Sequence, residues 1–361
     1  MNKILIINYQ GIGNTVLMMP LLSAIKGSNK FKQIDMTVKS GVIIDLLNEE
    51  GVIDNFIYYA RNNDVVNIFN LILERLRLIL KLRKTKYDIV VNIDQTQSLT
   101  SIFFMTLIRG CKKIGVNLNS GDFNPYDTIL TYSADQPEKF LYKKIAETIG
   151  IADLKTSFPV FKISEYEIKN SLNFLPEGSN SMVAIHPGCG ENLKYKRWGK
   201  ENFTELIREL ILIDKAHVLV LGGKEEDSLA KGILGNVESN KYTNLVGKLN
   251  IRETAAVLSK CSLIVSNDSG IMHLGGAMNV PVVAIFGPTS QAKNSPLGEK
   301  HILIGSDCDC DNSSNKLCNS CQQSWNDNHS IPLCLEHISV DNVLSGVYKA
   351  MEWCKYKTPT I

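Results

Sequence analysis

The sequence of 361 residues has no run of about 18–20 apolar residues, the length that a helix needs to span a membrane. The apolar stretch at the N-terminus is interrupted by Asn8, Gln10 and Gly11, and no small-residue cleavage site follows it. An excess of charge of one sign is also missing, because 39 basic residues nearly balance 37 acidic ones. These absences argue against a membrane-spanning, secreted or nucleic-acid-binding protein and predict a cytoplasmic one.

What is present is typical of a globular protein with two domains. Hydrophobic residues make up 44% of the chain and charged residues 21%, which excludes a disordered chain. The length is too great for one ordinary core. Between residues 151 and 180 the composition shifts toward proline, glycine and serine, which is typical of a connection. We expect an N-terminal domain at 1–165, a C-terminal domain at 166–345 and a terminal helix at 346–361.

Short apolar segments alternate with amphipathic helical segments in both halves of the chain. The apolar segments are rich in β-branched residues, as strands buried on both faces are. This alternation predicts an α/β fold with a parallel, doubly wound sheet in each domain, and ligands in such folds bind beyond the carboxyl ends of the strands. The predicted strands are 3–8, 33–38, 56–59, 87–93 and 113–116 in the N-terminal half, and 182–185, 217–221, 244–246, 263–266 and 282–286 in the C-terminal half.

The stretch 266–289 is the most informative segment for function. Asp268, Ser269 and Gly270 follow a predicted strand and open a predicted helix. The Ser269 hydroxyl and the free N–H groups of a helix N-terminus can bind a phosphate oxygen, and Gly270 permits a close approach. His273 lies one helical turn further on the same face, where it can give a diphosphate a hydrogen bond or positive charge. The alternative is that Asp268 only caps the helix and His273 only packs in the core.

Residues 266–289 resemble the C-terminal signature of glycosyltransferase family 9, the ADP-heptose:lipopolysaccharide heptosyltransferases. Segments 11–26, 87–95, 186–198 and 219–227 resemble other parts of the family in the same order. The resemblance implies the GT-B architecture, in which two Rossmann-like domains face a central cleft. It also implies inverting chemistry with no cofactor required for transfer. A nucleoside diphosphate sugar such as ADP-heptose would bind the C-terminal domain, and a lipopolysaccharide or other glycan acceptor the N-terminal domain.

The resemblance also implies roles for single residues on the donor side. Lys196 matches the family lysine that neutralises the donor phosphates, and a fixed ammonium suits a departing diphosphate. Lys194 is a second candidate for the same role. Gly188 would let the loop backbone approach a phosphate, and Glu225 or Glu226 matches an acidic position that contacts the ribose. The alternatives are surface lysines and an ordinary acid in the first turn of a helix.

On the acceptor side the sequence departs from the family. The family's first loop reads Gly-Asp, and that aspartate is its proposed general base, whereas this chain has Gly13-Asn14 in the turn that begins at Gly11. Asparagine cannot take up a proton in this way. Asn14 would then orient the acceptor while another group, such as Asp94, serves as base; or the reaction needs little base catalysis; or the chain binds without turnover. Asp94 can also be a helix cap or a structural carboxylate.

Five of the nine cysteines lie close together near the end of the chain. In a cytoplasmic protein such a group predicts a metal site before it predicts disulfides. The polar insert 307–334 buries little apolar surface, so a structural zinc or iron ion that cross-links it is expected, with a set of free thiols as the alternative. The five residues are Cys308, Cys310, Cys318, Cys321 and Cys334.

Residues 74–86 alternate apolar and basic side chains. The pattern is typical of an amphipathic helix with a solvated basic face. A second interpretation is contact with an anionic membrane surface or a phosphorylated lipid sugar, which would place the protein at the cytoplasmic face of a membrane.

The main hypothesis is therefore an inverting glycosyltransferase. A second is a non-catalytic nucleotide-sugar-binding or scaffold protein that has lost its base at Asn14, and a third is another GT-B enzyme such as a nucleotide-sugar epimerase. The sugar, the nucleobase and the acceptor stay open, because analogy of fold does not transfer specificity.

Overall fold

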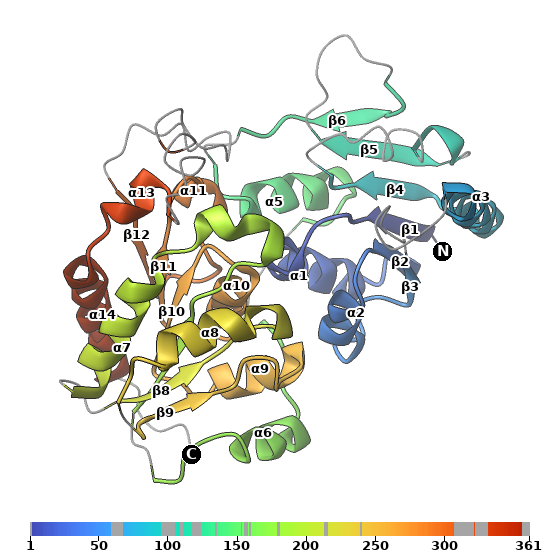
Figure 1. Ribbon diagram of the computed structural model, residues 1–361. Coiled ribbons are helices and arrows are strands. Elements are labelled where there is room, and N and C mark those ends of the chain that lie inside the picture. The colour runs from blue at the N-terminus through green and yellow to red at the C-terminus, as the bar shows by residue number, and fades with distance from the viewer. Residues whose placement is uncertain are drawn as a thin grey trace. The chain divides into compact units, whose positions relative to one another are not determined.

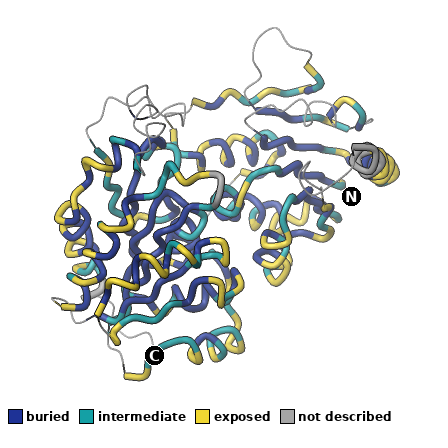
Figure 2. The backbone as a smooth tube through the Cα atoms, in the orientation of Figure 1, coloured by how far each residue is buried: buried dark blue, intermediate teal, exposed yellow. Residues whose placement is uncertain are grey.

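The computed structural model describes residues 2–58, 68–94, 105–108, 111–116, 124–133, 136–152, 154, 158, 160–178, 181–212, 216–238, 240–306, 321 and 331–355. The chain divides into two compact units, Met1–Thr156 and Ser157–Ile361. Each unit contains a six-stranded parallel sheet with helices packed against it (Figure 1). The central strands of each sheet are among the most deeply buried parts of the backbone (Figure 2). The predicted α/β class with two doubly wound sheets is confirmed.

The sheet of the N-terminal unit has the order β3-β2-β1-β4-β5-β6. β1 reads KILII after its first residue, and Ile4 to Ile7 are fully buried because helices cover both faces of the sheet. The strands are β1 (Asn2–Ile7), β2 (Phe31–Val38), β3 (Asn55–Tyr58), β4 (Ile89–Asn92), β5 (Lys112–Val116) and β6 (Thr128–Leu130).

The described helices of this unit are α1 (Ile12–Gly27), α2 (Gly41–Asn48), α3 (Ile68–Thr85) and α5 (Lys139–Thr148). α1 packs against both α2 and α5. α3 buries Leu78, Ile79 and Leu82 in a core cluster that contains Leu5 and Ile7 of β1. The helical interpretation of residues 74–86 is therefore confirmed over most of that stretch.

The sheet of the C-terminal unit has the order β12-β11-β10-β7-β8-β9. Its strands are β7 (Met182–His186), β8 (His217–Val220), β9 (Tyr242–Asn244), β10 (Leu263–Asn267), β11 (Val282–Ile285) and β12 (His301–Ile304). Counted within each unit, both sheets have the strand order 3-2-1-4-5-6 of a Rossmann fold. The order reverses between β1 and β4 in one sheet and between β7 and β10 in the other, and ligands of such sheets bind at this reversal.

The longer helices of the C-terminal unit are α6 (Glu165–Leu172), α7 (Lys200–Leu212), α8 (Asp227–Leu234), α9 (Ile251–Leu258), α10 (Gly270–Ala277) and α14 (Val340–Lys355). Shorter segments are η2 (Glu191–Lys196), η3 (Lys224–Glu226), α11 (Gln291–Asn294) and α13 (Leu333–Glu336). α7, α8 and α14 share one core cluster with the side chains that β7, β8, β10 and β11 direct to that face. The terminal helix thus belongs to the second sheet.

Two edge strands and one of the longer helices, α6, were not predicted from the sequence. β6 has three residues and β12 has four, and their side chains are only partly buried, so they lack a long apolar run. α6 lies inside the stretch that was predicted to be a connection. Among the described residues no helix is long and apolar enough to cross a membrane.

Candidate active site

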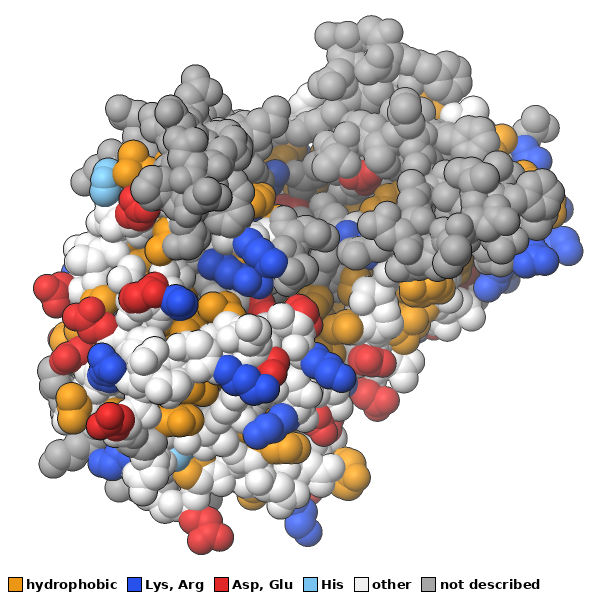
Figure 3. Space-filling view, in the orientation of Figure 1, with side chains coloured by type: hydrophobic (Ala, Val, Ile, Leu, Met, Phe, Trp, Pro, Cys, Tyr) orange, Lys and Arg blue, Asp and Glu red, His pale blue; other side chains and the backbone are white. Residues whose placement is uncertain are grey.

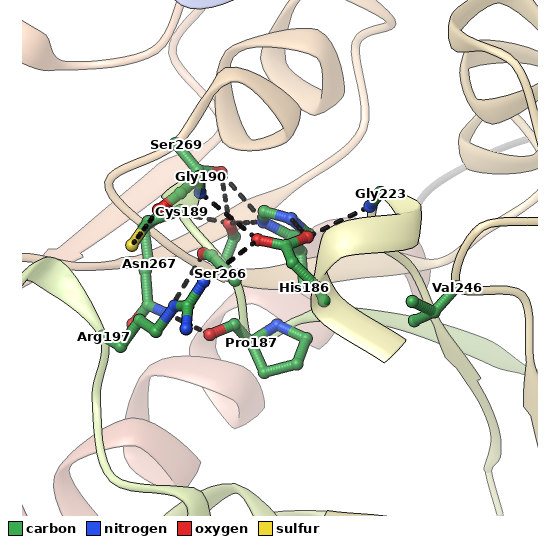
Figure 4. Close-up of polar contacts among 12 residues, drawn as sticks. His186, Pro187, Cys189, Gly190, Arg197, Gly223, Val246, Ser266, Asn267 and Ser269 are labelled. Carbon is green, nitrogen blue, oxygen red and sulfur yellow. Dashed lines mark hydrogen bonds and ion pairs between the residues drawn. The ribbon is translucent and has the colours of Figure 1, made fainter. Parts of the chain in front are cut away.

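Three loops at the carboxyl ends of neighbouring strands bring the polar residues of the C-terminal unit together (Figure 4). Residues 187–199 follow β7, residues 221–226 follow β8, and Asp268 and Ser269 lie between β10 and α10. β7 lies between β8 and β10 in the sheet, so the three loops meet at the point where the strand order reverses.

Lys196 and Asp268 form a largely buried ion pair. Lys196 Nζ donates to Asp268 Oδ2 at 2.8 Å, and Asn294 Nδ2 donates to the same oxygen at 3.3 Å. Burial alone would raise the pKa of Asp268, but the Lys196 ammonium, with smaller contributions from His273 and the Thr289 hydroxyl, holds the pKa below its ordinary value. Asp268 is therefore ionised at neutral pH, and the predicted donor-site residues Lys196 and Asp268 lie side by side.

His273 lies one turn into α10 and is 4% exposed. Among the described residues its Nδ1 has no hydrogen-bond partner, which is uncommon for a buried polar atom. Burial lowers the pKa of His273 to about 4, although Asp268 acts in the opposite direction. The imidazole is therefore uncharged at neutral pH, and it would offer a ligand a hydrogen bond without positive charge.

Ser269 is the N-cap of α10, so the alternative in which Asp268 caps this helix is wrong. The Ser269 hydroxyl accepts a hydrogen bond from the Met272 N–H at 3.2 Å. It also lies 3.0 Å from His186 Nδ1 and 3.0 Å from the Ser266 hydroxyl. These contacts fix the position of the hydroxyl at the N-terminus of α10, where Gly270 is the first helical residue.

Glu226 is a buried carboxylate that joins the loops after β7 and β8. It lies 3.1 Å from His186 Nε2, and it accepts hydrogen bonds from the N–H groups of Gly190 at 3.2 Å and Gly223 at 3.1 Å. Burial raises the pKa of Glu226, but the bond to His186 and the two N–H groups lower it to about 2. Because His186 also contacts Ser269, one chain of contacts connects all three loops.

The remaining donor-side candidates lie around this network. A Cβ atom at Gly188 would lie 1.7 Å from Glu226 Oε1. Only glycine therefore fits at this position while the carboxylate stays where it is. Lys194 is exposed on η2 and Glu225 is exposed on η3, whereas Glu226 is buried. Of the two glutamates considered for the ribose, Glu225 is therefore the one whose side chain faces solvent.

In the N-terminal unit the glycine turn after β1 leads into α1. Gly11 is the N-cap of α1, and the Thr15 hydroxyl donates to its carbonyl oxygen at 2.9 Å. Gln10 Nε2 donates to the carbonyl oxygen of Ile93 at 3.3 Å, which joins this turn to the end of β4 just before Asp94. Asp94 is 5% exposed. The turn and Asp94 thus lie at the same edge of the sheet, next to the reversal between β1 and β4.

Asn14 lies in the first turn of α1 beside Glu138, which directly precedes α5. Asn14 Nδ2 donates to Glu138 Oε1 at 3.1 Å. Glu138 is 2% exposed, so it is a second buried carboxylate at this edge besides Asp94. This contact could not be predicted from the sequence, because the two residues are 124 positions apart and no motif contains Glu138.

Comparison with known proteins identifies the family. The sequence pattern described as glycosyltransferase family 9 (heptosyltransferase) matches residues 75–322, which is more than half of the chain. The chain belongs to glycosyltransferase family 9. The resemblance inferred from residues 266–289 is confirmed.

Among curated family 9 relatives, lipopolysaccharide heptosyltransferase 2 of Escherichia coli strain K12 is 34% identical over 152 residues. The match covers 41% of this chain and 43% of that protein, so the chain spans less than half the length of this relative. A solved family 9 glycosyltransferase from Veillonella parvula has a TM-score of 0.78 at 18% identity, with 98% of each chain covered. The structure of E. coli ADP-heptose lps heptosyltransferase II has a TM-score of 0.71 at 21% identity, covering 98% of this chain and 99% of that one. At these identities the structures show the fold alone.

The cysteine group of this family 9 chain is only partly described. Cys308, Cys310 and Cys318 lie outside the described residues. Cys321 and Cys334 are both buried, and the Cys334 N–H donates to Cys321 Sγ at 3.3 Å. Among the described residues no group of three metal-ligating side chains occurs. The metal site therefore stays a prediction.

Proposed function

We propose that this family 9 protein is an inverting glycosyltransferase that moves a heptose-like sugar from a nucleoside diphosphate to a lipopolysaccharide or other glycan acceptor. The proposal rests mainly on the cluster of Lys196, Asp268 and His273 beside the N-terminus of α10. The heptose and the lipopolysaccharide are the sugar and the acceptor class in the names of relatives. ADP is the proposed nucleotide of the donor.

The donor site would act by holding the leaving diphosphate. The N–H groups of Gly270 and Ile271 at the start of α10 and the Ser269 hydroxyl would bind phosphate oxygens. The neutral His273 would add a hydrogen bond through Nδ1. Lys196 would supply positive charge as the bond between sugar and phosphate breaks, and a fixed charge in a largely buried site costs no reorganisation at that moment. Asp268 holds Lys196 in place.

Three further residues would complete the donor side. The backbone at Gly188 would approach a phosphate, and Lys194, exposed on η2, would add a second positive charge. The exposed carboxylate of Glu225 would accept hydrogen bonds from paired ribose hydroxyls.

The acceptor would bind at the turn formed by Gly11, Gly13 and Asn14. Asp94 is the proposed general base, because it follows β4 at the same sheet edge and carries a carboxylate, which Asn14 lacks. Its carboxylate would take the proton of the acceptor hydroxyl while the hydroxyl oxygen attacks the anomeric carbon. Attack from the side opposite the diphosphate inverts that carbon. No metal or cofactor is needed for this transfer.

A second candidate function is a non-catalytic nucleotide-sugar-binding or scaffold protein. Asn14 favours it, because an amide at that position cannot act as a base. The two candidates differ in one measurable property. An enzyme transfers the sugar from ADP-heptose to a heptose-terminated core oligosaccharide, whereas a binding protein shows donor affinity and no product with any acceptor.

The donor site is tested by thermal unfolding with a panel of nucleoside diphosphates and nucleotide sugars. A ligand at 100 times its Kd stabilises the folded state by about 2.7 kcal/mol, which shifts the Tm measurably. We expect ADP or an ADP-sugar to raise the Tm of the wild type and to leave that of Asp268→Ala unchanged. Equal shifts in both proteins would place the nucleotide elsewhere, and no shift with any ligand would leave the family resemblance as one of fold only.

We also propose that the cysteine group holds one structural zinc or iron ion. Adjacent buried thiols at Cys321 and Cys334, with a backbone N–H donated to one sulfur, suit the closed thiolate sites that these metals prefer. Such an ion would order the polar insert and take no part in the transfer. Elemental analysis should give about one metal ion per chain, and Cys321→Ser should lower that content. Equal metal content in both proteins would contradict this assignment.

Finally, we propose that α3 contacts the anionic surface at the cytoplasmic face of a membrane. Leu76 and Leu80 are 50% and 58% exposed, although their helix also carries a buried apolar face. Arg77, Lys81 and Lys84 are exposed beside them. Basic side chains gather over this helix (Figure 3). Exposed leucines flanked by basic side chains fit an interface with anionic headgroups.

A further inference from the structure

Glu138 places a carboxyl group in a buried position behind the acceptor turn. Its Oε1 accepts hydrogen bonds from Asn14 Nδ2 at 3.1 Å and from the Tyr142 hydroxyl at 3.4 Å. The Tyr142 hydroxyl also lies 3.1 Å from the backbone carbonyl oxygen of Asn14. Both the side chain and the backbone of Asn14 are therefore tied to α5.

An ionised Glu138 would decide which end of the Asn14 amide faces it. An ionised carboxylate can only accept hydrogen bonds, so the NH2 end of the amide must point toward it. The carbonyl oxygen Oδ1 is then held on the other side of the amide, away from Glu138. A neutral partner such as glutamine offers both a donor and an acceptor, and would allow either orientation.

We propose that Glu138 is ionised and is a positioning residue that acts through Asn14. It holds Asn14 so that Oδ1 accepts a hydrogen bond from an acceptor hydroxyl next to the attacking one, whose own proton goes to Asp94. This inference rests on the proposed function, because it assigns a role at the acceptor turn of the proposed transferase. It also gives Asn14 a task that an amide can perform: it orients the acceptor without taking up a proton.

A purely structural role would not need the charge. The hydrogen bonds from Asn14 and Tyr142 require only an oxygen acceptor, which a glutamine would supply without the desolvation of an ion. The carboxylate is costly to bury, and what it adds over glutamine is a single permitted orientation of the amide.

The contact also predicts which residues position 14 tolerates. In Asn14→Asp two carboxylates would face each other at about the present 3.1 Å, and like charges at that distance cannot both stay ionised without cost. The double variant Asn14→Asp with Glu138→Gln restores one donor and one acceptor and keeps the net charge. We expect a lower Tm in Asn14→Asp than in the wild type, and a higher Tm in the double variant than in Asn14→Asp.

The decisive experiment compares Glu138→Gln and Glu138→Leu with the wild type. The control is Glu147→Gln, which removes an exposed carboxylate from the same helix. The donor is ADP-heptose, and the acceptor is a deacylated, heptose-terminated core oligosaccharide. The measurements are kcat and KM for the acceptor, KM for the donor, and the Tm shift that ADP causes.

Results that support the inference would show an effect on the kinetics of the acceptor and none on those of the donor. We expect Glu138→Leu to lower kcat/KM for the acceptor about tenfold, since a misplaced nucleophile is costly, with donor KM and the ADP-induced Tm shift unchanged. Glu138→Gln keeps the shape of the side chain, so its kcat/KM for the acceptor should lie between those of Glu138→Leu and the wild type. Glu147→Gln should have the same kcat/KM as the wild type. Because the glutamine variant is nearly isosteric, it tests the inference even where leucine impairs folding.

Two other results would overturn the inference in different ways. If the wild type transfers sugar and both Glu138 variants keep acceptor kinetics within about twofold, below the value of one hydrogen bond, Glu138 has only a structural role. If the wild type binds ADP and transfers nothing to this acceptor, the proposed function fails for that acceptor class, and the inference fails with it.

Discussion

At the scale of single residues, the position of the Glu226 carboxylate requires two neighbouring residues without side chains, Gly188 and Gly222. A Cβ atom at Gly188 would lie 1.7 Å from this carboxylate, and one at Gly222 would lie 2.7 Å from it. The two glycines leave the space in which Glu226 reaches His186 and the N–H groups of Gly190 and Gly223. The structure of the loops after β7 and β8 therefore depends on these two glycines.

Gly188→Ala tests this dependence. The added methyl group must displace the Glu226 carboxylate, so we expect a loss of about 2 kcal/mol in the free energy of unfolding and a loss of ADP binding. The control is Gly232→Ala in α8, where nothing lies within 4 Å of the added Cβ and alanine should be neutral or stabilising. Urea unfolding of both variants measures the effect, and equal stabilities would contradict it.

Glu226 also makes stability depend on pH. Its pKa is lowered from 4.5 to about 2 in the folded protein. A lowered carboxyl pKa stabilises the fold above the unfolded value, and this stabilisation is lost as the pH falls from about 5 to about 2. Glu226→Gln should therefore have a lower Tm than the wild type at pH 7. The difference in Tm between the two proteins should decrease as the pH falls toward 2. Parallel Tm curves for the two proteins would show that Glu226 carries no such linkage.

The sequence predicted the proposed donor residues, but it did not predict the residues that contact them. Lys196, Asp268 and His273 could be named in advance, because they lie in motifs at predicted strand and helix ends. The positions of His186 and Glu138 in the contact networks could not, because their partners are distant in sequence and no local pattern marks a buried contact. Pairings of this kind depend on the folded positions of helices and loops, which hydrophobic periodicity does not encode.

At the scale of elements, α6 lies in a stretch that was predicted to be a connection, yet it packs against α9 of the C-terminal unit. The helix begins with a capping box formed by Ser164 and Glu167. The same Glu167 carboxylate accepts hydrogen bonds from Arg252 Nε and Nη2 in α9, and Arg252 Nη2 also donates to the carbonyl oxygen of Lys162. The short helix is thus fixed to α9 by charged hydrogen bonds, which composition alone could not reveal.

Glu167→Gln should weaken this attachment. The bond from Arg252 is the main cause that lowers the Glu167 pKa to about 2, so the neutral amide loses a charge-assisted, two-point contact. We expect a loss of about 2 kcal/mol in the free energy of unfolding at pH 7. The exposed Glu165 on the same helix provides the control as Glu165→Gln, which should cost much less. If the two variants unfold alike, Arg252 does not anchor α6.

At the scale of the whole molecule, the proposed membrane contact of α3 can be measured on the full chain. Vesicles with about a third anionic lipid should sediment the wild type at low salt and release it at high salt, because the attraction is screened. Leu80→Ser should weaken sedimentation, because the exposed leucine no longer inserts among the headgroups. Leu172→Ser, at another exposed leucine, is the control. Unchanged sedimentation of Leu80→Ser would exclude α3 as the contact.

The contacts among Lys196, Asp268, His273, His186, Glu226 and Ser269 all lie inside one compact unit, Ser157–Ile361. This arrangement has an evolutionary consequence. Under the proposed function, a lineage that keeps this half would inherit its nucleotide preference while the other half diversifies toward new glycans. We would therefore expect close relatives to differ more in the residues around Gly11–Asn14 than in those around Asp268. Exchange of N-terminal halves between such relatives should change the product and preserve the nucleotide.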